Sequence, residues 1–236
     1  MRPFRSALLG AVLSLFALAG SSRAAAGGEI RSDVPEAVDP TERHLFYLHG
    51  AWIEQGGLER LHPTHGRYEY QAIVRALTER GFVVISEARQ DETDAEAYAK
   101  KVASQVRRLL EKGVPPSQVT VIGHSKGGSI ALLAASELQE EKVRFAILAG
   151  CGKRRSAFGR SFERLLDERA ARLRGRFLSI YDASDEVAGS CRQAFERAAV
   201  AESPEVVLQT GLGHALFWSP RPVWIDEVVE WAEAKP

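Results

Sequence analysis

The stretch Val119-Thr-Val-Ile-Gly-His-Ser-Lys-Gly-Gly128 decides the fold of this chain of 236 residues. Its first residues are apolar or β-branched and predict a buried strand, and the residues from Lys126 onward predict a helix. A G-x-S-x-G pattern between a strand and a helix is typical of a nucleophilic serine on a sharp turn. Gly123 and Gly127 supply the small residues that this turn needs around Ser125. We expect the N–H of Lys126, at the helix start, to face negative charge that develops at the serine.

Apolar runs and amphipathic segments alternate along the rest of the chain. The runs predict strands at 45–48, 82–85, 119–122, 145–148, 177–180 and 206–208. The segments predict helices at 68–80, 94–112, 126–140, 158–173, 187–200 and 222–234. Nearly continuous apolar strands are typical of parallel sheets that are covered on both faces. The sequence therefore predicts an α/β fold, a doubly wound and mostly parallel sheet of about six strands with helices on both faces.

A nucleophilic serine needs a histidine base and a carboxylate that orients the histidine. His214 is the only histidine downstream of Ser125, and it follows the last predicted strand. The loop after the strand at 177–180 holds two aspartates, Asp182 and Asp185. Asp185 is favoured as the acid because it lies farther into the loop, just ahead of a predicted helix. Asp182 is the alternative, and it is better suited to support the turn through backbone hydrogen bonds.

The loop His49-Gly-Ala-Trp52 follows the first predicted strand and reaches the same sheet edge. We expect the N–H of Ala51 to be the second donor to the oxyanion, beside that of Lys126.

Three side chains near this edge are candidates for substrate binding. Trp52 and Leu216 could form apolar walls, and the alternative for each is ordinary core packing. Arg89, just after the strand at 82–85, would either hold an anionic group of the substrate or pair with a nearby carboxylate.

The composition of the chain excludes several classes of binding partner. The 31 basic and 31 acidic residues cancel, which removes the excess positive charge that drives nonspecific binding to nucleic acid or anionic lipid. His62 and His65 lack a cysteine or acidic partner at the spacing of a metal site. We expect no metal, no organic cofactor and no nucleic-acid partner, and we leave the oligomeric state open.

The N-terminal residues predict export. Residues 1–26 contain two early arginines, an uncharged run from Ala7 to Ala19 and a small-residue cleavage site at Ala24-Ala-Ala26. This is the pattern of a signal peptide, and the apolar run is shorter than the roughly 20 residues that a membrane-spanning helix needs. We expect a periplasmic or secreted product with no stable membrane association after cleavage of the signal peptide. We also expect a lead-in at 27–43 and a single domain at 44–236.

The two cysteines of the sequence are Cys151 and Cys191. In an oxidising compartment two exported cysteines favour a disulfide, and the alternative is a pair of buried free thiols. A bond that closes this loop would stabilise the fold by about 4 kcal/mol on the chain-entropy model.

The motifs together resemble the α/β-hydrolase superfamily over residues 44–231, with His49-Gly50, the serine turn, Asp185 and Gly213-His214 at the positions of its oxyanion loop, nucleophile, acid and base. The stretches 47–51, 85–89, 182–191 and 210–214 are also similar to a group of uncharacterised exported bacterial α/β hydrolases. The interval 150–176 is short and predicts one helix, so we expect no large cap domain and an open, shallow site.

This resemblance implies a serine hydrolase that cleaves a small carboxylic ester through an acyl-enzyme. Amide, peptide, lactone or thioester hydrolysis by the same groups is an alternative. A non-catalytic binding protein on a hydrolase scaffold is the alternative from another class.

Overall fold

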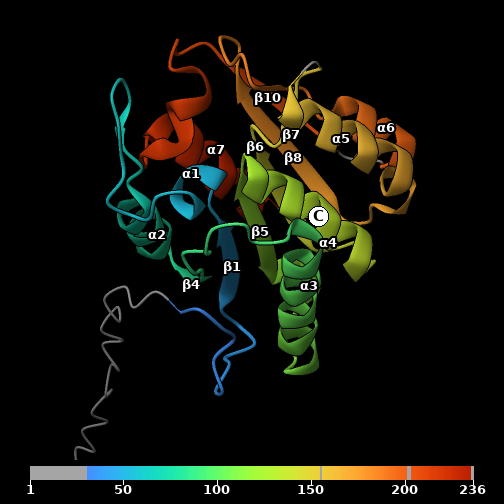
Figure 1. Cartoon of the computed structure of the whole chain (residues 1–236). Coiled ribbons are helices and arrows are strands. Elements are labelled where there is room, and N and C mark those ends of the chain that lie inside the picture. Colours follow the sequence, from blue (N-terminus) through green and yellow to red (C-terminus); the bar gives the residue numbers. More distant parts are fainter. Residues whose placement is uncertain (1–30, 155, 201–202, 235–236) are drawn as a thin grey trace, which may run out of the picture.

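The computed structural model describes residues 31–154, 156–200 and 203–234. The predicted signal peptide at 1–26 lies outside the described residues. A parallel sheet of six strands forms the centre of the molecule, in the order β10-β8-β6-β5-β1-β4 (Figure 1). The predicted fold class is confirmed. Its strands are β1 Arg43–Leu48, β4 Phe82–Ile85, β5 Val119–His124, β6 Arg144–Leu148, β8 Arg176–Asp182 and β10 Glu205–Leu208.

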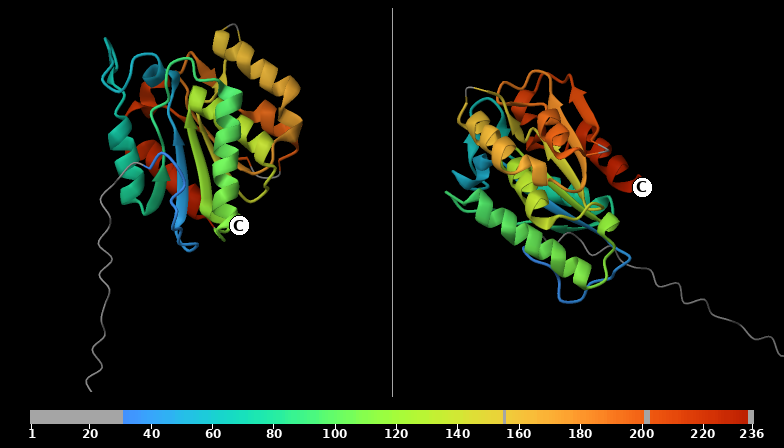
Figure 2. Two further views of the ribbon diagram at one scale, coloured as in Figure 1. Left: turned by 60° about the horizontal axis from the view of Figure 1, so that its bottom comes forward. Right: turned by 90° about the vertical axis from the view of Figure 1, so that its right-hand side faces the viewer.

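Helices cover both faces of this sheet (Figure 1). One face carries α1 Ala51–Glu54, α2 Tyr70–Glu79 and α7 Pro222–Glu233, and the other carries α3 Ala95–Glu111, α4 Lys126–Leu138, α5 Ala157–Glu168 and α6 Arg192–Ala198. The views in Figure 2 show α3 running alongside the strands. The described chain also contains short 3₁₀ helices, η1 Pro116–Gln118, η2 Ala170–Arg172 and η3 Gly213–Trp218.

Side chains of the strands alternate between two apolar clusters. On β1, Phe46 and Leu48 join the cluster under α3 to α6, whereas Leu45 and Tyr47 join the cluster under α2 and α7. All four side chains are at most 2% exposed. Because both faces of the strands are buried, the strands read as continuous apolar runs rather than as an alternating pattern.

The order of the strands places the site. The chain passes from β1 outward to β4 and then returns to β5 on the other side of β1. In such a sheet, the loops after the two strands at this reversal separate and leave a crevice in which ligands bind. Leu48 pairs with Gly123 across β1 and β5, so the loop at 49–52 and the serine turn lie side by side.

Several predicted boundaries need correction. The helix predicted at 94–112 is α3, and the carboxylate of Asp94 caps it by accepting from the N–H of Ala97. The predicted helix at 187–200 is wrong at its beginning, because a short strand occupies that part. This strand, β9 Ala188–Gly189, pairs with β7 Cys151–Gly152. A hairpin of β2 Leu61–His62 and β3 Gly66–Arg67 was not predicted.

The described part of the lead-in packs against the sheet and α3. Arg31 bridges to Ile85, and Asp33 accepts a hydrogen bond from the Gln105 side chain at 2.9 Å. Val34 and Val38 lie against the core cluster under α3. This segment therefore covers one margin of the domain.

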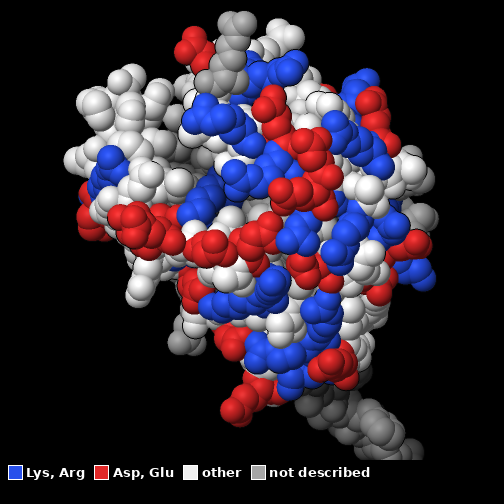
Figure 3. All heavy atoms as spheres, turned by 45° about the vertical axis from the view of Figure 1, so that its right-hand side comes forward, with Lys and Arg blue, Asp and Glu red and all other residues white. Residues whose placement is uncertain are grey.

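The surface carries a mixture of charges. On the face shown in Figure 3, lysine and arginine side chains lie interspersed with aspartate and glutamate. Among the described residues, no helix combines the length and the apolar character that crossing a membrane requires.

Candidate active site

Ser125 lies on a strained turn between β5 and α4. Its backbone has φ 54° and ψ −122°, which is an unfavourable conformation for a residue with a side chain. A Cβ added at Gly123 would clash with the carbonyl of Gly127, and one added at Gly127 would clash with the carbonyl of Leu48. The glycines at both positions therefore allow the turn to pack closely enough to hold Ser125 above the sheet edge.

The three residues of the predicted triad lie in hydrogen-bond contact. His214 Nε2 is 2.8 Å from Ser125 Oγ, and His214 Nδ1 is 2.8 Å from Asp185 Oδ2. Since a carboxylate only accepts hydrogen bonds, Nδ1 carries the proton and Nε2 is free to accept the serine proton. The arrangement is the one that proton transfer from a serine to a histidine requires.

Asp185 is held by its own loop. Its side chain is fully buried, and its Oδ1 accepts from the N–H groups of Val187 and Ala188 at 2.7 and 2.9 Å. These bonds leave Oδ2 directed at His214. The carboxylate is therefore fixed in the orientation that the imidazole ring needs.

Asp182, the alternative acid, supports the turn instead. It accepts hydrogen bonds from the backbone and hydroxyl of both Ser184 and Thr210. Burial alone would raise the pKa of Asp182, but these hydrogen bonds outweigh burial and lower the pKa to about 2. The side chain joins the loop of Asp185 to the loop that leads to His214.

Both predicted oxyanion donors are the first residues of helices. Ala51 begins α1 and Lys126 begins α4. The first N–H groups of a helix have no acceptor within the helix, so they are free to bind an anion. An added Cβ at Gly50 would lie 3.4 Å from the Cβ of Ser125, which shows how closely the two loops approach each other.

Arg89 does not take the predicted substrate-binding position. Its guanidinium is fully buried, and its Nε donates to Glu54 at 2.7 Å. It also donates to the carbonyl of His49. The prediction of an anion clamp is corrected, and the alternative of carboxylate pairing is the one observed. Glu54 also pairs with the Lys126 ammonium, which donates in addition to the Thr93 carbonyl at 2.7 Å.

His49 braces the oxyanion loop as a neutral ring. Its Nε2 accepts from the N–H of Arg89, and its Nδ1 donates to the carbonyl of Gly50, both at 2.8 Å. Burial, with the nearby Arg89 charge, lowers the pKa of His49 to about 3. The ring therefore holds a fixed tautomer at neutral pH.

The two apolar candidates for substrate binding differ. Leu216 is fully buried in the core cluster beneath η3, so it offers no surface to a substrate and its predicted role is corrected. Trp52 is half-buried, with its ring 5.2 Å from that of Trp218 and beneath the guanidinium of Arg60. Its contact with a substrate stays a prediction.

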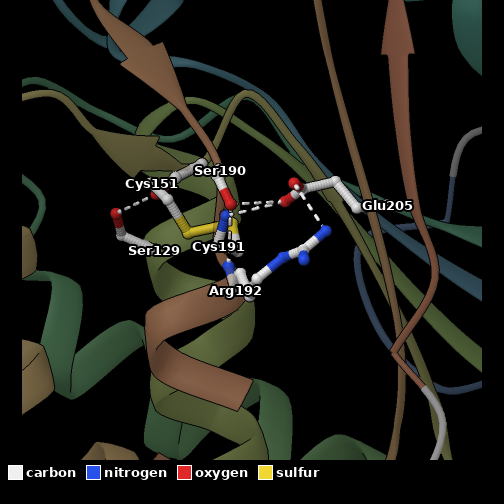
Figure 4. The surroundings of a disulfide bond; sticks show 7 residues. Ser129, Cys151, Ser190, Cys191, Arg192 and Glu205 are labelled. Atoms are coloured by element: carbon white, nitrogen blue, oxygen red, sulfur yellow. Dashed lines mark hydrogen bonds and ion pairs between the residues drawn. A yellow bond between two sulfur atoms is a disulfide. The ribbon is translucent and has the colours of Figure 1, made fainter. Parts of the chain in front are cut away.

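The disulfide between Cys151 and Cys191 is present (Figure 4). It links β7 to the residue before α6, and β7 in turn pairs with β9, the strand just after the Asp185 loop. Glu205 on β10 accepts from the hydroxyl of Ser190 and from the N–H of Cys191 at 2.9 and 3.1 Å. The bond therefore lies in the scaffold that carries Asp185.

The sequence did not reveal two residues of the site, Glu54 and Tyr68. Glu54 is buried although it is charged, and Tyr68 contacts the serine turn from a distant segment. The only local signal for Glu54 is its place one turn after the oxyanion loop. Tyr68 has no such signal because its contact depends on the tertiary fold.

Among the described residues, no group of three or more histidine, cysteine or acidic side chains is placed to hold a metal ion.

The known proteins that this chain is similar to include lipases and another hydrolase. The model of the family named Lipase (class 3) matches residues 53–197. No curated protein matches the chain significantly. Among solved structures, a candidate dienelactone hydrolase from Klebsiella pneumoniae is 14% identical, with a TM-score of 0.58 over 85% of this chain and 90% of that chain.

Two lipases have similar structures. Monoglyceride lipase from Saccharomyces cerevisiae is 9% identical, with a TM-score of 0.57 over 85% of this chain and 89% of that chain. Monoacylglycerol lipase from Paleococcus ferrophilus is 16% identical, with a TM-score of 0.55 over 80% of this chain and 93% of that chain. At these identities the likeness shows the fold that this chain shares with them.

Proposed function

The chain belongs to the class 3 lipase family, and we propose that it hydrolyses carboxylic esters with Ser125 as nucleophile, His214 as base and Asp185 as the orienting acid. Family membership makes the protein a serine hydrolase that acts on esters. The observation that carries the assignment of these three residues is the unbroken hydrogen-bond path from Ser125 Oγ through His214 to Asp185.

The reaction follows from this path. Ser125 Oγ attacks the acyl carbon while His214 Nε2 takes its proton, and Asp185 stabilises the imidazolium that results. The oxyanion binds the N–H groups of Ala51 and Lys126. His214 then gives the proton to the leaving alcohol, and an ester between Ser125 and the acyl group remains. A water molecule then attacks the acyl carbon while His214 Nε2 takes one of its protons, and His214 returns this proton to Ser125 Oγ as the acyl–Oγ bond breaks and the carboxylic acid leaves.

The substrate class is a small ester. Between β6 and β8 the described chain holds β7, α5 and η2, and this short insertion supports an uncapped site. The buried positions of Arg89 and Leu216 remove two groups that would have selected an anionic or large apolar substrate. We expect short acyl chains to react faster than long ones.

Hydrolysis of p-nitrophenyl acetate, butyrate and palmitate by wild type, Ser125→Ala and His214→Ala tests this proposal. We expect turnover of the short esters by wild type, and a loss of about a thousandfold or more in both variants with the fold retained. Substantial turnover by Ser125→Ala would overturn the assignment of the nucleophile. Near-normal turnover by His214→Ala would show that another group is the base.

We also propose export. The arginines and the apolar run within residues 1–26 support it, and a disulfide is typical of an oxidising compartment. N-terminal sequencing of protein from the periplasm or medium should find a mature chain that begins near Gly27. Recovery of the chain with its intact N-terminus from the cytosol alone would contradict this proposal.

A further inference from the structure

A buried chain of hydrogen bonds lies behind the serine turn. Tyr47 Oη is 2.7 Å from Tyr68 Oη, and Tyr68 Oη is 3.1 Å from His124 Nδ1. His124 Nε2 is 3.2 Å from the carbonyl oxygen of His214. Tyr47, Tyr68 and His124 are each at most 2% exposed, so none of the three reaches a substrate.

The chemistry of the two atoms in each hydrogen bond decides which of them donates. The carbonyl of His214 can only accept, so His124 Nε2 carries the ring proton. Burial, together with the neighbouring His214, holds the pKa of His124 well below its usual range, so the ring has one proton and Nδ1 accepts from the Tyr68 hydroxyl. The Tyr68 oxygen then accepts from Tyr47. Burial raises the pKa of Tyr68, which keeps this hydroxyl protonated and able to donate.

The chain of bonds connects the parts of the site that the reaction must hold in register. Tyr47 lies one residue before the end of β1, the strand that leads into the oxyanion loop, and a Cβ added at Gly50 of this loop would lie 3.0 Å from His124 Nδ1. His124 ends β5 directly before Ser125, and its ring lies 4.9 Å from that of His214. The bonds therefore run from the strand that leads into the oxyanion loop, past the nucleophile, to the backbone of the base.

We propose that Tyr68 and His124 are positioning residues that fix the backbone of His214 relative to Ser125 and the oxyanion loop. This inference rests on the proposed function, since it assigns to both residues an effect on the base of that reaction. A neutral His124 suits this role because it donates to the His214 carbonyl without adding a positive charge beside the imidazolium. Misplacement of a base by about 1 Å is enough to slow an enzymatic reaction greatly.

Tyr68→Phe removes only the hydroxyl, and Tyr70→Phe is its matched control. The Tyr70 hydroxyl is also buried, but it bonds to Ser86 Oγ at 2.7 Å and not to His124. With p-nitrophenyl butyrate, we expect Tyr68→Phe to lower kcat about tenfold while KM stays within about twofold. Tyr70→Phe should keep both constants within about twofold of wild type. Equal kcat values in the two variants would overturn the proposal.

Rescue by a conservative side chain separates positioning from packing. His124→Phe removes both hydrogen bonds, whereas the amide of His124→Gln can still donate to the His214 carbonyl. We expect the glutamine variant to recover a kcat at least about fivefold above that of the phenylalanine variant. Equal kcat values in two variants with equal melting temperatures would contradict the positioning role.

Ser125→Ala distinguishes this inference from the proposed function. If Ser125→Ala still turns over the ester, the proposed function fails and the inference with it. If Ser125→Ala is inactive while Tyr68→Phe matches Tyr70→Phe, the proposed function stands and the inference alone is wrong.

Discussion

Asp182 accepts hydrogen bonds from the N–H and the hydroxyl of Thr210, 28 residues farther along the chain, at 2.8 and 2.6 Å. These bonds join the end of β8 to the loop after β10. Asp185 lies in the loop after β8 and His214 follows the loop after β10, so the Asp182 contacts bring the proposed acid and the proposed base together. Asp182 and Asp185, three residues apart, thus have different contacts, one within the scaffold and one with the histidine.

Asparagine substitution separates the roles of the two aspartates. In Asp185→Asn, the neutral amide no longer stabilises an imidazolium and favours the wrong tautomer of His214, so kcat should fall by about a thousandfold or more. Asp182→Asn should lower the melting temperature and cost about 1–3 kcal/mol of stability, with a smaller loss of kcat. Ester turnover and thermal unfolding of both variants give the ranking, and the reverse order in kcat would reassign the acid.

Removal of the buried arginine should destabilise the fold strongly. Arg89→Met leaves the buried Glu54 with Lys126 as its remaining cation, and breaking such a buried pair costs about 3–5 kcal/mol. Arg67→Met is the control because its partner Glu59 is 80% exposed, and exposed pairs contribute about 0–1 kcal/mol. Urea unfolding should rank the two variants in this order. Equal losses would show that Glu54 tolerates the loss of its partner.

Stability should fall as the pH drops below neutrality. The pKa of His49 is lowered to about 3, and that of His124 is also lowered, so the unfolded chain binds more protons than the native one below about pH 6.5. Both rings contribute their full stabilisation of the native state above about pH 6.5, and this stabilisation is lost as the pH falls toward their native pKa values. His49 alone should lower the unfolding free energy by about 2 kcal/mol between pH 7 and pH 5, and His124 should lower it further in the same direction.

Urea unfolding at several pH values measures this slope. His124→Gln has one buried histidine fewer, so its unfolding free energy should depend less steeply on pH between 5 and 7. A wild-type stability that stays constant over this range, or a variant with an unchanged slope, would contradict the assignment of neutral native rings.

Loss of the disulfide should destabilise the protein. Cys151 and Cys191 are 40 residues apart, and a loop of this length gives a stabilisation of about 4 kcal/mol on the chain-entropy model. Urea unfolding of wild type and of the double alanine variant measures the difference. Peptide mapping without reductant should find the two cysteines linked, and two freely alkylated thiols in protein from an oxidising compartment would contradict the bond.

The serine turn could be predicted from sequence because its determinants are local. A strand, two glycines, a serine and a helix start follow one another within ten residues, and the local sterics dictate the bend. His214 and Asp185 could be placed at the same edge because the carboxyl ends of parallel strands meet there. The choice between Asp182 and Asp185 rested on loop position, and the structure brings Asp185 to His214.

Side-chain direction and distant contacts could not be predicted in the same way. Arg89 and Leu216 lie near the site in sequence, yet both turn inward, Arg89 to Glu54 and Leu216 to the core. The strand β9 depends on its partner β7, which lies far away along the chain, so the local sequence predicted a helix instead. Tyr68 belongs to the same class, because only the fold brings it to His124.

Fluorophosphonate labelling of the mature wild type and of Ser125→Ala, followed by intact mass and peptide mapping, tests the central claim most directly. An activated serine reacts with this probe whatever ester is the natural substrate. We predict one adduct on the peptide that carries Ser125 in wild type and none in the variant. An unlabelled, well-folded wild type, or an adduct that persists in Ser125→Ala, would contradict the assignment of Ser125 as the nucleophile.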